Sequence, residues 1–266
     1  MRPGPSAKPA RPNPMISTIA IEARIRKVLR KYGFELYKTA SVKRGVQYDL
    51  NIPHANYAPW NLDAEFLDVF GKIRQDSFVD KFRCYELWRI VRQSARLHGS
   101  LIEVGVWKGG TASVIAMAAK LSGQDCPIYL CENFRGVVKP TAADTHYRGG
   151  EHADSSKAKI GHYLGEVFAI RGFRILDGIF PDETGAALTN EQFKFAHIDV
   201  DTHKSAGDAF DFIWPRLVAG GCVVFDDYGF SRCDGVAKLV DAMFGLPDRL
   251  IVHNLNGHAI VIKLPA

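Results

Sequence analysis

Short apolar runs and helical apolar periods alternate along most of the chain. The apolar runs predict strands, and the segments in which apolar residues recur every three or four positions predict helices. The predicted strands cover residues 100–104, 127–131, 173–176, 193–198 and 222–225, and the predicted helices cover residues 111–121, 156–170, 205–217 and 235–244. Such alternation is typical of right-handed strand-helix-strand units, which build a parallel sheet with helices on its faces.

The C-terminal segment departs from this pattern. Residues 249–263 contain two apolar runs around Asn256-Gly257, and an Asn-Gly pair between such runs is a strong signal for a β-hairpin. We therefore expect an α/β fold in which a mostly parallel, seven-stranded sheet ends in an antiparallel hairpin.

The N-terminal third differs in composition. Its first residues combine prolines with basic residues and lack an apolar core, which predicts a disordered leader over residues 1–16 rather than a secretory signal. A basic amphipathic helix at 18–31 and apolar periods between 62 and 97 predict a helical extension over residues 17–98 that helps to cover an acceptor site. The sheet-forming part, residues 99–266, is then the main domain.

Charge is unevenly distributed along the chain. Residues 1–46 carry eleven Lys or Arg and two acidic residues, within a chain whose formal net charge is +5. Basic segments can bind nucleic acid or a membrane surface. Here the basic residues form the polar face of the predicted helix. The alternation of aromatic and basic residues that is typical of a nucleic-acid-binding groove does not follow. We therefore expect neither partner, and a role of this segment in homo-oligomer contacts stays open.

Composition indicates a globular protein of the cytoplasm. The 266 residues, 47% of them hydrophobic, suffice for a large buried core, and every apolar run is far shorter than the roughly 20 residues of a membrane span. The five cysteines form no Cys-x-x-Cys pair and lie mostly in apolar segments. This indicates buried thiols in a reducing compartment rather than disulfides or a zinc site.

A turn with spaced glycines follows the predicted strand at 100–104. Its sequence, Glu103-Val-Gly105-Val-Trp-Lys-Gly109-Gly110-Thr111, lets the backbone turn sharply, and the free amides that open the next helix attract a polar ligand. A dinucleotide-binding turn has glycine where Glu103 stands. A carboxylate there would repel a pyrophosphate and suit a cationic ligand, such as one with an amino group and a sulfonium.

This turn resembles the first motif of class I S-adenosylmethionine-dependent methyltransferases, whose Rossmann-like parallel sheet also ends in an antiparallel hairpin. The resemblance implies that S-adenosylmethionine binds along the turn, with its carboxylate at the helix-start amides. The implied cofactor contacts are Glu103, Gly105, Val106, Trp107, Gly109, Gly110 and Thr111.

An acidic residue follows each of the five predicted parallel strands, and the carboxyl ends of parallel strands meet at one ligand crevice. At the second strand, the carboxylate of Glu132 could accept both ribose hydroxyls of a nucleoside. The resemblance to methyltransferases implies that Asn133 and Phe134, which follow it, belong to the same ribose segment. At the third, apolar and polar groups suited to flank an adenine ring stand together at Asp177, Gly178 and Ile179. A single such acid often only caps a helix or turn, but five together indicate a site.

Three carboxylates follow the fourth and fifth strands, at Asp199, Asp226 and Asp227. They would repel one another unless a cation or protons offset their charge. All-oxygen ligands favour a hard ion such as Mg²⁺ or Ca²⁺. The alternative is that one aspartate caps the next helix and another the turn at Tyr228, which would leave a single exposed acid.

The same region resembles the macrocin-type sugar O-methyltransferases. In that family a strand ending Ile-Asp-x-Asp, a helix ending Pro-Arg-Leu, a Gly-Gly turn and a strand ending Asp-Asp-Tyr recur, and residues 196–229 follow this order. The resemblance covers residues 75–245. It implies Mg²⁺-dependent methyl transfer from S-adenosylmethionine to a sugar hydroxyl, with Asp199, Asp226 and Asp227 at the metal.

Two residues are candidates for the base that takes the proton from the acceptor hydroxyl. The resemblance makes Asp199 one candidate, next to the cofactor. His203, in a position where relatives often have tyrosine, is either a second base or a helix-start residue that faces solvent.

Candidate acceptor contacts are mainly aromatic. They come from the N-terminal loop, from a polar insertion at 137–155 with the composition of a mobile lid, and from the turn after the fifth strand. The candidates are Tyr57, Trp60, His146 and Tyr228.

The sequence thus predicts an S-adenosylmethionine- and Mg²⁺-dependent O-methyltransferase whose acceptor is a hydroxylated small molecule, such as a sugar or a glycosylated natural product. Two alternatives stay open. One is a catechol-type O-methyltransferase, which would use a similar metal and cofactor arrangement. The other is a binding protein that keeps the nucleoside pocket without turnover, although the intact acidic cluster argues against it.

Overall fold

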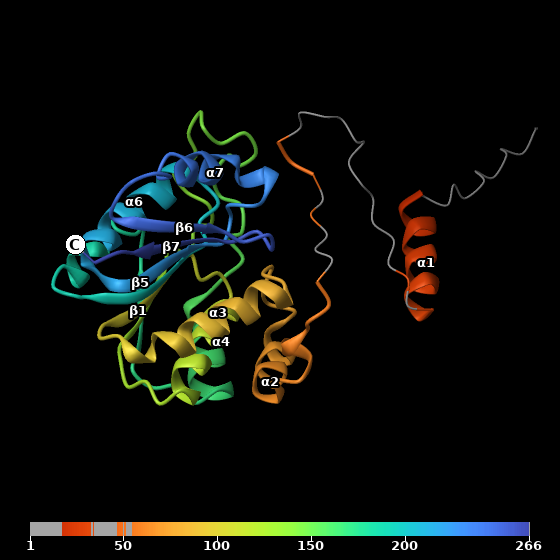
Figure 1. The fold of residues 1–266 in the computed structure, drawn as a ribbon, viewed down its shortest axis with the longest axis horizontal. Coiled ribbons are helices and arrows are strands. Elements are labelled where there is room, and N and C mark those ends of the chain that lie inside the picture. Colours follow the sequence, from red (N-terminus) through yellow and green to blue (C-terminus); the bar gives the residue numbers. More distant parts are fainter. Residues whose placement is uncertain (1–17, 33, 35–46, 50, 52–54, 266) are drawn as a thin grey trace, which may run out of the picture. The chain divides into compact units, whose positions relative to one another are not determined.

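The computed structural model describes residues 18–32, 34, 47–49, 51 and 55–265. The chain divides into two compact units, residues 1–50 and 51–266 (Figure 1). In the first unit, helix α1 spans Thr18–Lys31, as the sequence predicted. The predicted disordered leader at 1–16 lies outside the described residues.

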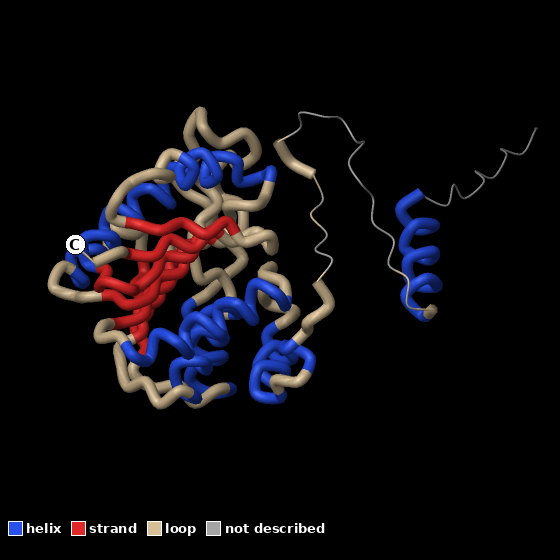
Figure 2. The backbone as a smooth tube through the Cα atoms, viewed as in Figure 1, coloured by secondary structure: helices blue, strands red, loops and turns tan. Residues whose placement is uncertain are grey.

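The second unit contains a seven-stranded sheet with the strand order β3-β2-β1-β4-β5-β7-β6 (Figure 2). The first five strands of this order are parallel, and β7 pairs antiparallel with both β5 and β6. The strands are β1 Ser100–Val104, β2 Ile128–Glu132, β3 Phe173–Asp177, β4 Phe193–Ile198, β5 Leu217–Phe225, β6 Arg249–His253 and β7 Ala259–Lys263. The predicted fold class is confirmed.

Helices cover both faces of this sheet because side chains alternate between the faces along each strand. Leu101 packs into one core with α2, α3 and α4, whereas the next residue, Ile102, packs into a second core with α6 and α7. The helices are α2 Ala64–Ile73, α3 Lys81–Gln93, α4 Gly110–Leu121, α5 Lys157–Gly161, α6 His203–Ile213 and α7 Asp234–Asp241. None of these described helices has the length and apolar character that crossing a membrane requires.

Helices α2 and α3 belong to the same compact unit as the sheet. Their apolar faces contribute Phe66, Leu87 and Trp88, all fully buried, to the core shared with α4. The boundary predicted at residue 98 therefore lies inside a unit, because these two helices form one layer of the fold.

Several predicted boundaries differ from the structure. The helix predicted at 156–170 is the short α5 followed by a π-helical segment, His162–Val167. The helix predicted to reach Leu217 ends at Ile213, because Pro215 has no amide hydrogen to continue it. Strand β5 begins at Leu217 rather than Cys222, and it passes through an irregularity near Gly220, whose φ is +78°.

The C-terminal hairpin is confirmed, but its connection is longer than an Asn-Gly turn. Residues 254–258 separate β6 from β7, and the Asn254 amide donates to the His258 carbonyl at 2.9 Å. The side chains of Asn254, Asn256 and His258 all turn toward Glu86 on α3. The loop is thus shaped by a tertiary contact rather than by the turn residues alone.

Candidate functional site

A cavity of about 570 Å³ lies over the carboxyl ends of β1, β2, β4 and β5, where ligands bind in open parallel sheets. Ten of the predicted site residues line it: Gly105, Val106, Trp107, Gly110, Thr111, Glu132, Asn133, Asp199, Asp226 and Asp227. We call the part over β1 and β2 the glycine half and the part over β4 and β5 the acidic half.

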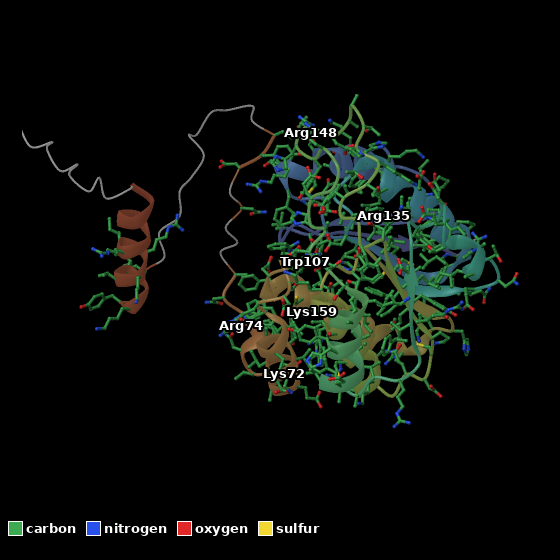
Figure 3. The ribbon with its side chains drawn as sticks, turned by 180° about the vertical axis from the view of Figure 1, so that it is seen from behind. Lys72, Arg74, Trp107, Arg135, Arg148 and Lys159 are labelled. Atoms are coloured by element: carbon green, nitrogen blue, oxygen red, sulfur yellow. The ribbon has the colours of Figure 1, made fainter. Side chains whose placement is uncertain are left out.

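The glycine half depends on two residues that have no Cβ. Gly105 has a φ of +85°, and a Cβ there would lie 1.8 Å from the carbonyl oxygen of Asp199. A Cβ on Gly110 would lie 2.6 Å from the Cβ of Ser77, which precedes α3. Gly109 is the left-handed N-cap of α4 and lies beneath the cavity lining. Trp107, which is labelled in Figure 3, belongs to the same turn. Its φ is +48°.

Glu132 fixes the shape of this turn. One carboxylate oxygen accepts hydrogen bonds from the amides of Val106 and Trp107, at 3.0 and 2.7 Å. The other accepts from the amide of Phe134 at 2.9 Å. A carboxylate held by three backbone donors is a fixed acceptor at the cavity wall, which suits the predicted ribose contact.

Glu103 does not face the cavity, contrary to the predicted contact with a cationic ligand. Alternation along β1 places its side chain on the same face as Leu101, toward the helical core. It is 1% exposed, and its Oε1 lies 2.8 Å from Nδ1 of His197 on β4. Burial alone would lower the pKa of His197, but the carboxylates of Asp226 and Glu103 raise it to about 10.

The acidic half brings Asp199, Asp226 and Asp227 together. Each offers a carboxylate oxygen, and these oxygens lie within 4.8 Å of one another. Burial and the neighbouring carboxylates raise the pKa of Asp199 well above its usual range, and burial with the charge of Asp201 raises that of Asp227 to about 8. The cluster therefore carries more negative charge than its buried surroundings stabilise.

Asp226 differs from the other two because cationic groups surround it. It forms a buried ion pair with Arg83 of α3, and Nε2 of His258 lies 2.9 Å from its Oδ1. Burial opposes ionisation, but Arg83 and the two histidines hold the pKa of Asp226 well below its usual range. Nδ1 of His258 in turn lies 2.5 Å from Glu86. Sequence reasoning missed Arg83, Glu86 and His258, because no local pattern links them to β5.

Some predicted nucleoside contacts lie outside the cavity. Asp177 is exposed, 3.9 Å from Lys157, and the amide of Ile179 donates to Glu183. Gly178 and Phe134 also do not line the cavity. The adenine contacts at Asp177, Gly178 and Ile179 and the ribose contact at Phe134 stay predictions.

The predicted acceptor contacts also lie elsewhere. Tyr57 is 81% exposed, and Trp60 packs against Phe82 and Tyr85 in the helical layer. The hydroxyl of Tyr228 donates to Asp241 on α7. His146 is exposed and does not line the cavity, whereas the next residue, Tyr147, does.

The two candidate bases are also separated. Asp199 lines the cavity, whereas His203 begins α6, its amide donates to Asp144, and it is absent from the cavity lining. Of these two candidates, Asp199 lines the cavity and His203 does not.

Several lining residues were not predicted. They come from the segment before α3 and from the insertion and turns beside the acidic half: Asp76, Ser77, Phe78, Val79, Tyr147, His152, Asp201 and Cys233. Asp201 had a sequence signal, since it closes the Ile-Asp-x-Asp motif two residues after Asp199.

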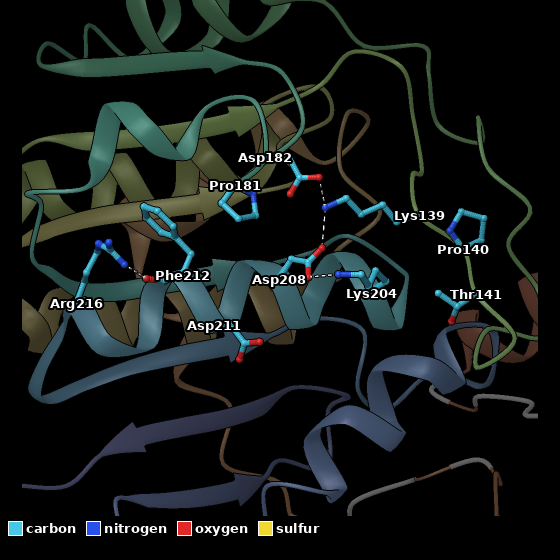
Figure 4. Close-up of a pocket in the computed structure, with 10 residues that line it drawn as sticks. All are labelled: Lys139, Pro140, Thr141, Pro181, Asp182, Lys204, Asp208, Asp211, Phe212 and Arg216. Carbon is cyan, nitrogen blue, oxygen red and sulfur yellow. Dashed lines mark hydrogen bonds and ion pairs between the residues drawn. The ribbon is translucent and has the colours of Figure 1, made fainter.

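A second, more open cavity of about 710 Å³ lies beside α6 (Figure 4). Lys139 lies 2.8 Å from Asp182 and 2.7 Å from Asp208, and Lys204 also pairs with Asp208. Its charges are thus largely satisfied by one another, and none of its lining residues belongs to a strand of the sheet.

A family model described as Macrocin-O-methyltransferase (TylF) matches residues 77–244, well over half of the chain. The chain belongs to this family. The match includes the glycine turn, Glu132 and the three clustered aspartates, and it confirms the family expected from the sequence.

Named relatives of this chain modify sugar-bearing natural products. This chain is 27% identical over 161 residues to 8-demethyl-8-(2,3-dimethoxy-alpha-L-rhamnosyl)-tetracenomycin-C 4'-O-methyltransferase of Streptomyces olivaceus. The match covers 56% of this chain and 60% of that protein. This chain is 26% identical over 171 residues to Mycinamicin III 3''-O-methyltransferase of Micromonospora griseorubida, covering 60% and 66%. The chain thus spans less than two thirds of the length of these relatives.

Solved structures show the same fold. The O-methyltransferase NovP superposes with a TM-score of 0.58 at 20% identity, covering 69% of this chain and 80% of NovP. The calicheamicin methyltransferase CalS11 superposes with a TM-score of 0.59 at 16% identity, covering 78% and 94%.

Proposed function

We propose that this protein transfers a methyl group from S-adenosylmethionine to a hydroxyl group of a sugar or glycosylated natural product, and that Mg²⁺ assists the transfer. One observation carries the proposal. In a member of this family, a single cavity joins the glycine turn and Glu132 to the buried carboxylates of Asp199, Asp226 and Asp227.

The glycine half suits the methyl donor. The left-handed N-cap at Gly109 leaves the first amides of α4 without helical partners, and such amides favour an anionic group such as the donor's carboxylate. Glu132 offers a fixed acceptor for ribose hydroxyls. When bound, the donor supplies an electrophilic methyl group on a sulfonium.

The acidic half suits a hard divalent cation. Its donors are all carboxylate oxygens. Burial, together with the neighbouring carboxylates, raises the pKa of Asp199 and Asp227, and a bound cation would offset both effects. Arg83 already offsets the charge of Asp226. A bound Mg²⁺ would lower the pKa of a coordinated hydroxyl and so make it a better nucleophile.

Asp199 is the residue that takes the proton. Its carboxylate accepts no hydrogen bond from the described residues, and it lines the acidic half of the cavity. The acceptor hydroxyl gives its proton to a carboxylate oxygen of Asp199 while its own oxygen takes the methyl group from the sulfonium.

The acceptor class rests on the relatives, one of whose names specifies a rhamnosyl compound. A catechol-type acceptor would fit the same metal and donor, so the test must offer both. The purified full chain is incubated with S-adenosylmethionine, Mg²⁺ and either a rhamnosylated aglycone or a catechol, and products are identified by mass spectrometry. We expect methylation of the glycoside.

Asp199→Asn and Asp227→Asn test the acidic half, with Asp182→Asn, in the cavity beside α6, as the matched control. We expect the first two to lose at least about a hundred-fold in turnover, the order of a lost general base, and to bind Mg²⁺ more weakly by calorimetry. Full activity in both variants would refute the metal mechanism. Binding of NADH in place of S-adenosylhomocysteine would refute the proposed function.

A further inference from the structure

Two buried histidines lie beside the acidic half and have no part in the chemistry above. They are His197 on β4 and His258 in the loop before β7, and both are 0% exposed. Each directs its Nε2 toward the carboxylate of Asp226. One ligand atom from each of the three residues lies within 4.8 Å of the other two. Asp226 lines the cavity, whereas the two histidines lie behind it.

We propose that His197, His258 and Asp226 bind a divalent transition-metal ion, with Zn²⁺ as the ion that fits best. Two imidazole nitrogens distinguish this site from the three carboxylates of the acidic half, because imidazole suits zinc whereas Mg²⁺ prefers oxygen ligands. The two sites would share Asp226. The inference goes beyond the proposed function and does not depend on methyl transfer.

The spacing of the three atoms suits one small ion. Nε2 of His258 lies 2.9 Å from Oδ1 of Asp226, and Nε2 of His197 lies 3.6 Å from the same oxygen. Ligand atoms around a tetrahedral zinc ion lie roughly 3.3 Å from one another. Arg83 pairs with the other oxygen, Oδ2. Oδ1 is therefore the oxygen that faces the two histidines.

Nε2 of His197 points to a ligand. Among the described residues this buried nitrogen has no hydrogen-bond partner. Its distance of 3.6 Å to Oδ1 of Asp226 exceeds that of a hydrogen bond. Buried polar atoms without a partner are rare because they lose their hydration and gain nothing in return. A metal ion bound by both atoms would satisfy this nitrogen.

A second carboxylate orients each histidine. Nδ1 of His197 lies 2.8 Å from Glu103 on β1, and Nδ1 of His258 lies 2.5 Å from Glu86 on α3. A histidine that binds a metal typically donates its other ring N–H to a carboxylate, which fixes the tautomer and the direction of the ring. The structure contains this arrangement twice around one carboxylate oxygen.

The charges around the site leave room for a divalent cation. Glu86, Glu103 and Asp226 bring three carboxylates together, and Arg83 is the one Lys or Arg of the described chain that pairs with any of them. One divalent ion bound by two neutral imidazoles would supply the two missing positive charges. Protons on both imidazoles would supply them too, and the experiment must separate these two cases.

A bound ion would join segments that are far apart in the chain. Its ligands come from β4, from the end of β5 and from the C-terminal hairpin loop. The cysteine pattern predicted no zinc site, but these ligands are histidines that only the fold brings together. Because an ion that binds only the folded chain stabilises it, Zn²⁺ should raise the stability of the protein.

The test measures metal binding by the purified full chain after a chelator has removed bound metals. Zn²⁺ is titrated calorimetrically in excess Mg²⁺, which competes for the carboxylates of the acidic half. Co²⁺ then serves as a probe, because its absorption spectrum reports nitrogen ligands. His197→Gln and His258→Gln each remove a ligand, and Glu86→Gln weakens the orientation of one. The controls are His253→Gln, an exposed histidine of β6, and Asp199→Asn.

We expect wild-type protein, His253→Gln and Asp199→Asn to bind Zn²⁺ with similar affinity and to give the same Co²⁺ spectrum. Glu86→Gln should bind Zn²⁺ about ten- to a hundred-fold more weakly, the order of a lost orienting partner. His197→Gln and His258→Gln should lose at least as much. Zn²⁺ should raise the melting temperature of wild-type protein and leave that of the two histidine variants unchanged.

Three outcomes would overturn the inference. One is that wild-type protein binds no Zn²⁺, and another is that it binds Zn²⁺ no better than both histidine variants do. Either result would leave a hydrogen-bonded pair of protonated histidines. The third is an equal loss in Asp199→Asn, which would place the ion in the acidic half. If the histidine variants do not fold, Glu86→Gln, which keeps all three ligands, decides alone.

Discussion

The two halves of the cavity are built in different ways. In the glycine half, backbone groups and one carboxylate form the surface, and the decisive residues lie in one turn between β1 and α4. In the acidic half, side chains form the surface, and they come from α3, the turns after β4 and β5, and the insertion. His258 of the C-terminal hairpin loop contacts Asp226 without lining the cavity. The first half depends on the shape of the main chain, whereas the second depends on a balance of buried charges.

This difference shows why the two halves should respond differently to substitution. A surface formed by the backbone is lost when an added side chain keeps the main chain from packing closely against its neighbours. A charge-balanced surface fails when one partner is removed and the other is left buried without compensation. The following predictions test this contrast, beginning with the largest expected effect.

Gly105→Ala should be the most damaging single change. The added Cβ would overlap the carbonyl oxygen of Asp199, and the φ of +85° is strained for alanine. We expect a loss of more than about 4 kcal/mol of folding stability, together with loss of S-adenosylhomocysteine binding. Urea denaturation and calorimetry measure both.

The control is Gly123→Ala at the end of α4. Its φ of +71° imposes similar backbone strain, but a Cβ there would meet no atom within 4 Å. It should cost only about 1–2 kcal/mol. Similar losses in the two variants would show that backbone strain, rather than close approach, makes Gly105 necessary.

Arg83→Met should rank second. It leaves the carboxylate of Asp226 buried without its main cation, which typically costs about 3–5 kcal/mol. Arg92→Met on the same helix removes an exposed pair with Glu65 and should cost no more than about 1 kcal/mol. If both variants lose the same stability, the balance of charges proposed for the acidic half is wrong.

The Arg83 effect should depend on pH. Because the folded pKa of Asp226 is held below its unfolded value, the pair contributes fully above that unfolded value, about 3.9. Its contribution is lost as the pH falls through the folded pKa. The stability difference between wild type and Arg83→Met should therefore be constant near neutrality and shrink in acid, as measured by denaturation from pH 7 to pH 3.

Tyr57→Ala should have the smallest effect. The side chain is 81% exposed and lies outside the cavity lining, so stability should change by less than about 0.5 kcal/mol. The KM for a glycosylated acceptor should change by less than about two-fold. A large increase in KM would restore Tyr57 as an acceptor contact and show that the site extends beyond the cavity.

Local chemistry made much of the fold and the glycine half predictable. The apolar runs and periods located every strand of the sheet and the helices around it, because burial on a pleated or helical surface imposes a fixed period. The need for glycine at Gly105 followed from the turn itself. The convergence of Asp199, Asp226 and Asp227 followed from topology, since parallel strands end at one edge.

The errors have one cause in common. Glu103 faces His197 rather than a ligand, and Tyr147 rather than its neighbour His146 faces the cavity, because the packing of distant segments decides which way a side chain points. The hairpin loop is longer than its Asn-Gly pair implied because its polar side chains bind Glu86.

The sequence alone therefore determined which residues end each strand. It also determined that acidic residues gather at one edge of the sheet. Only the tertiary structure decided how those acids differ. Arg83 and His258 reach Asp226 from positions 143 and 32 residues away, and they leave Asp199 and Asp227 without a comparable cation. The physical reason is that the free energy of a buried charge depends on its neighbours in space, and a single sequence records only its neighbours along the chain.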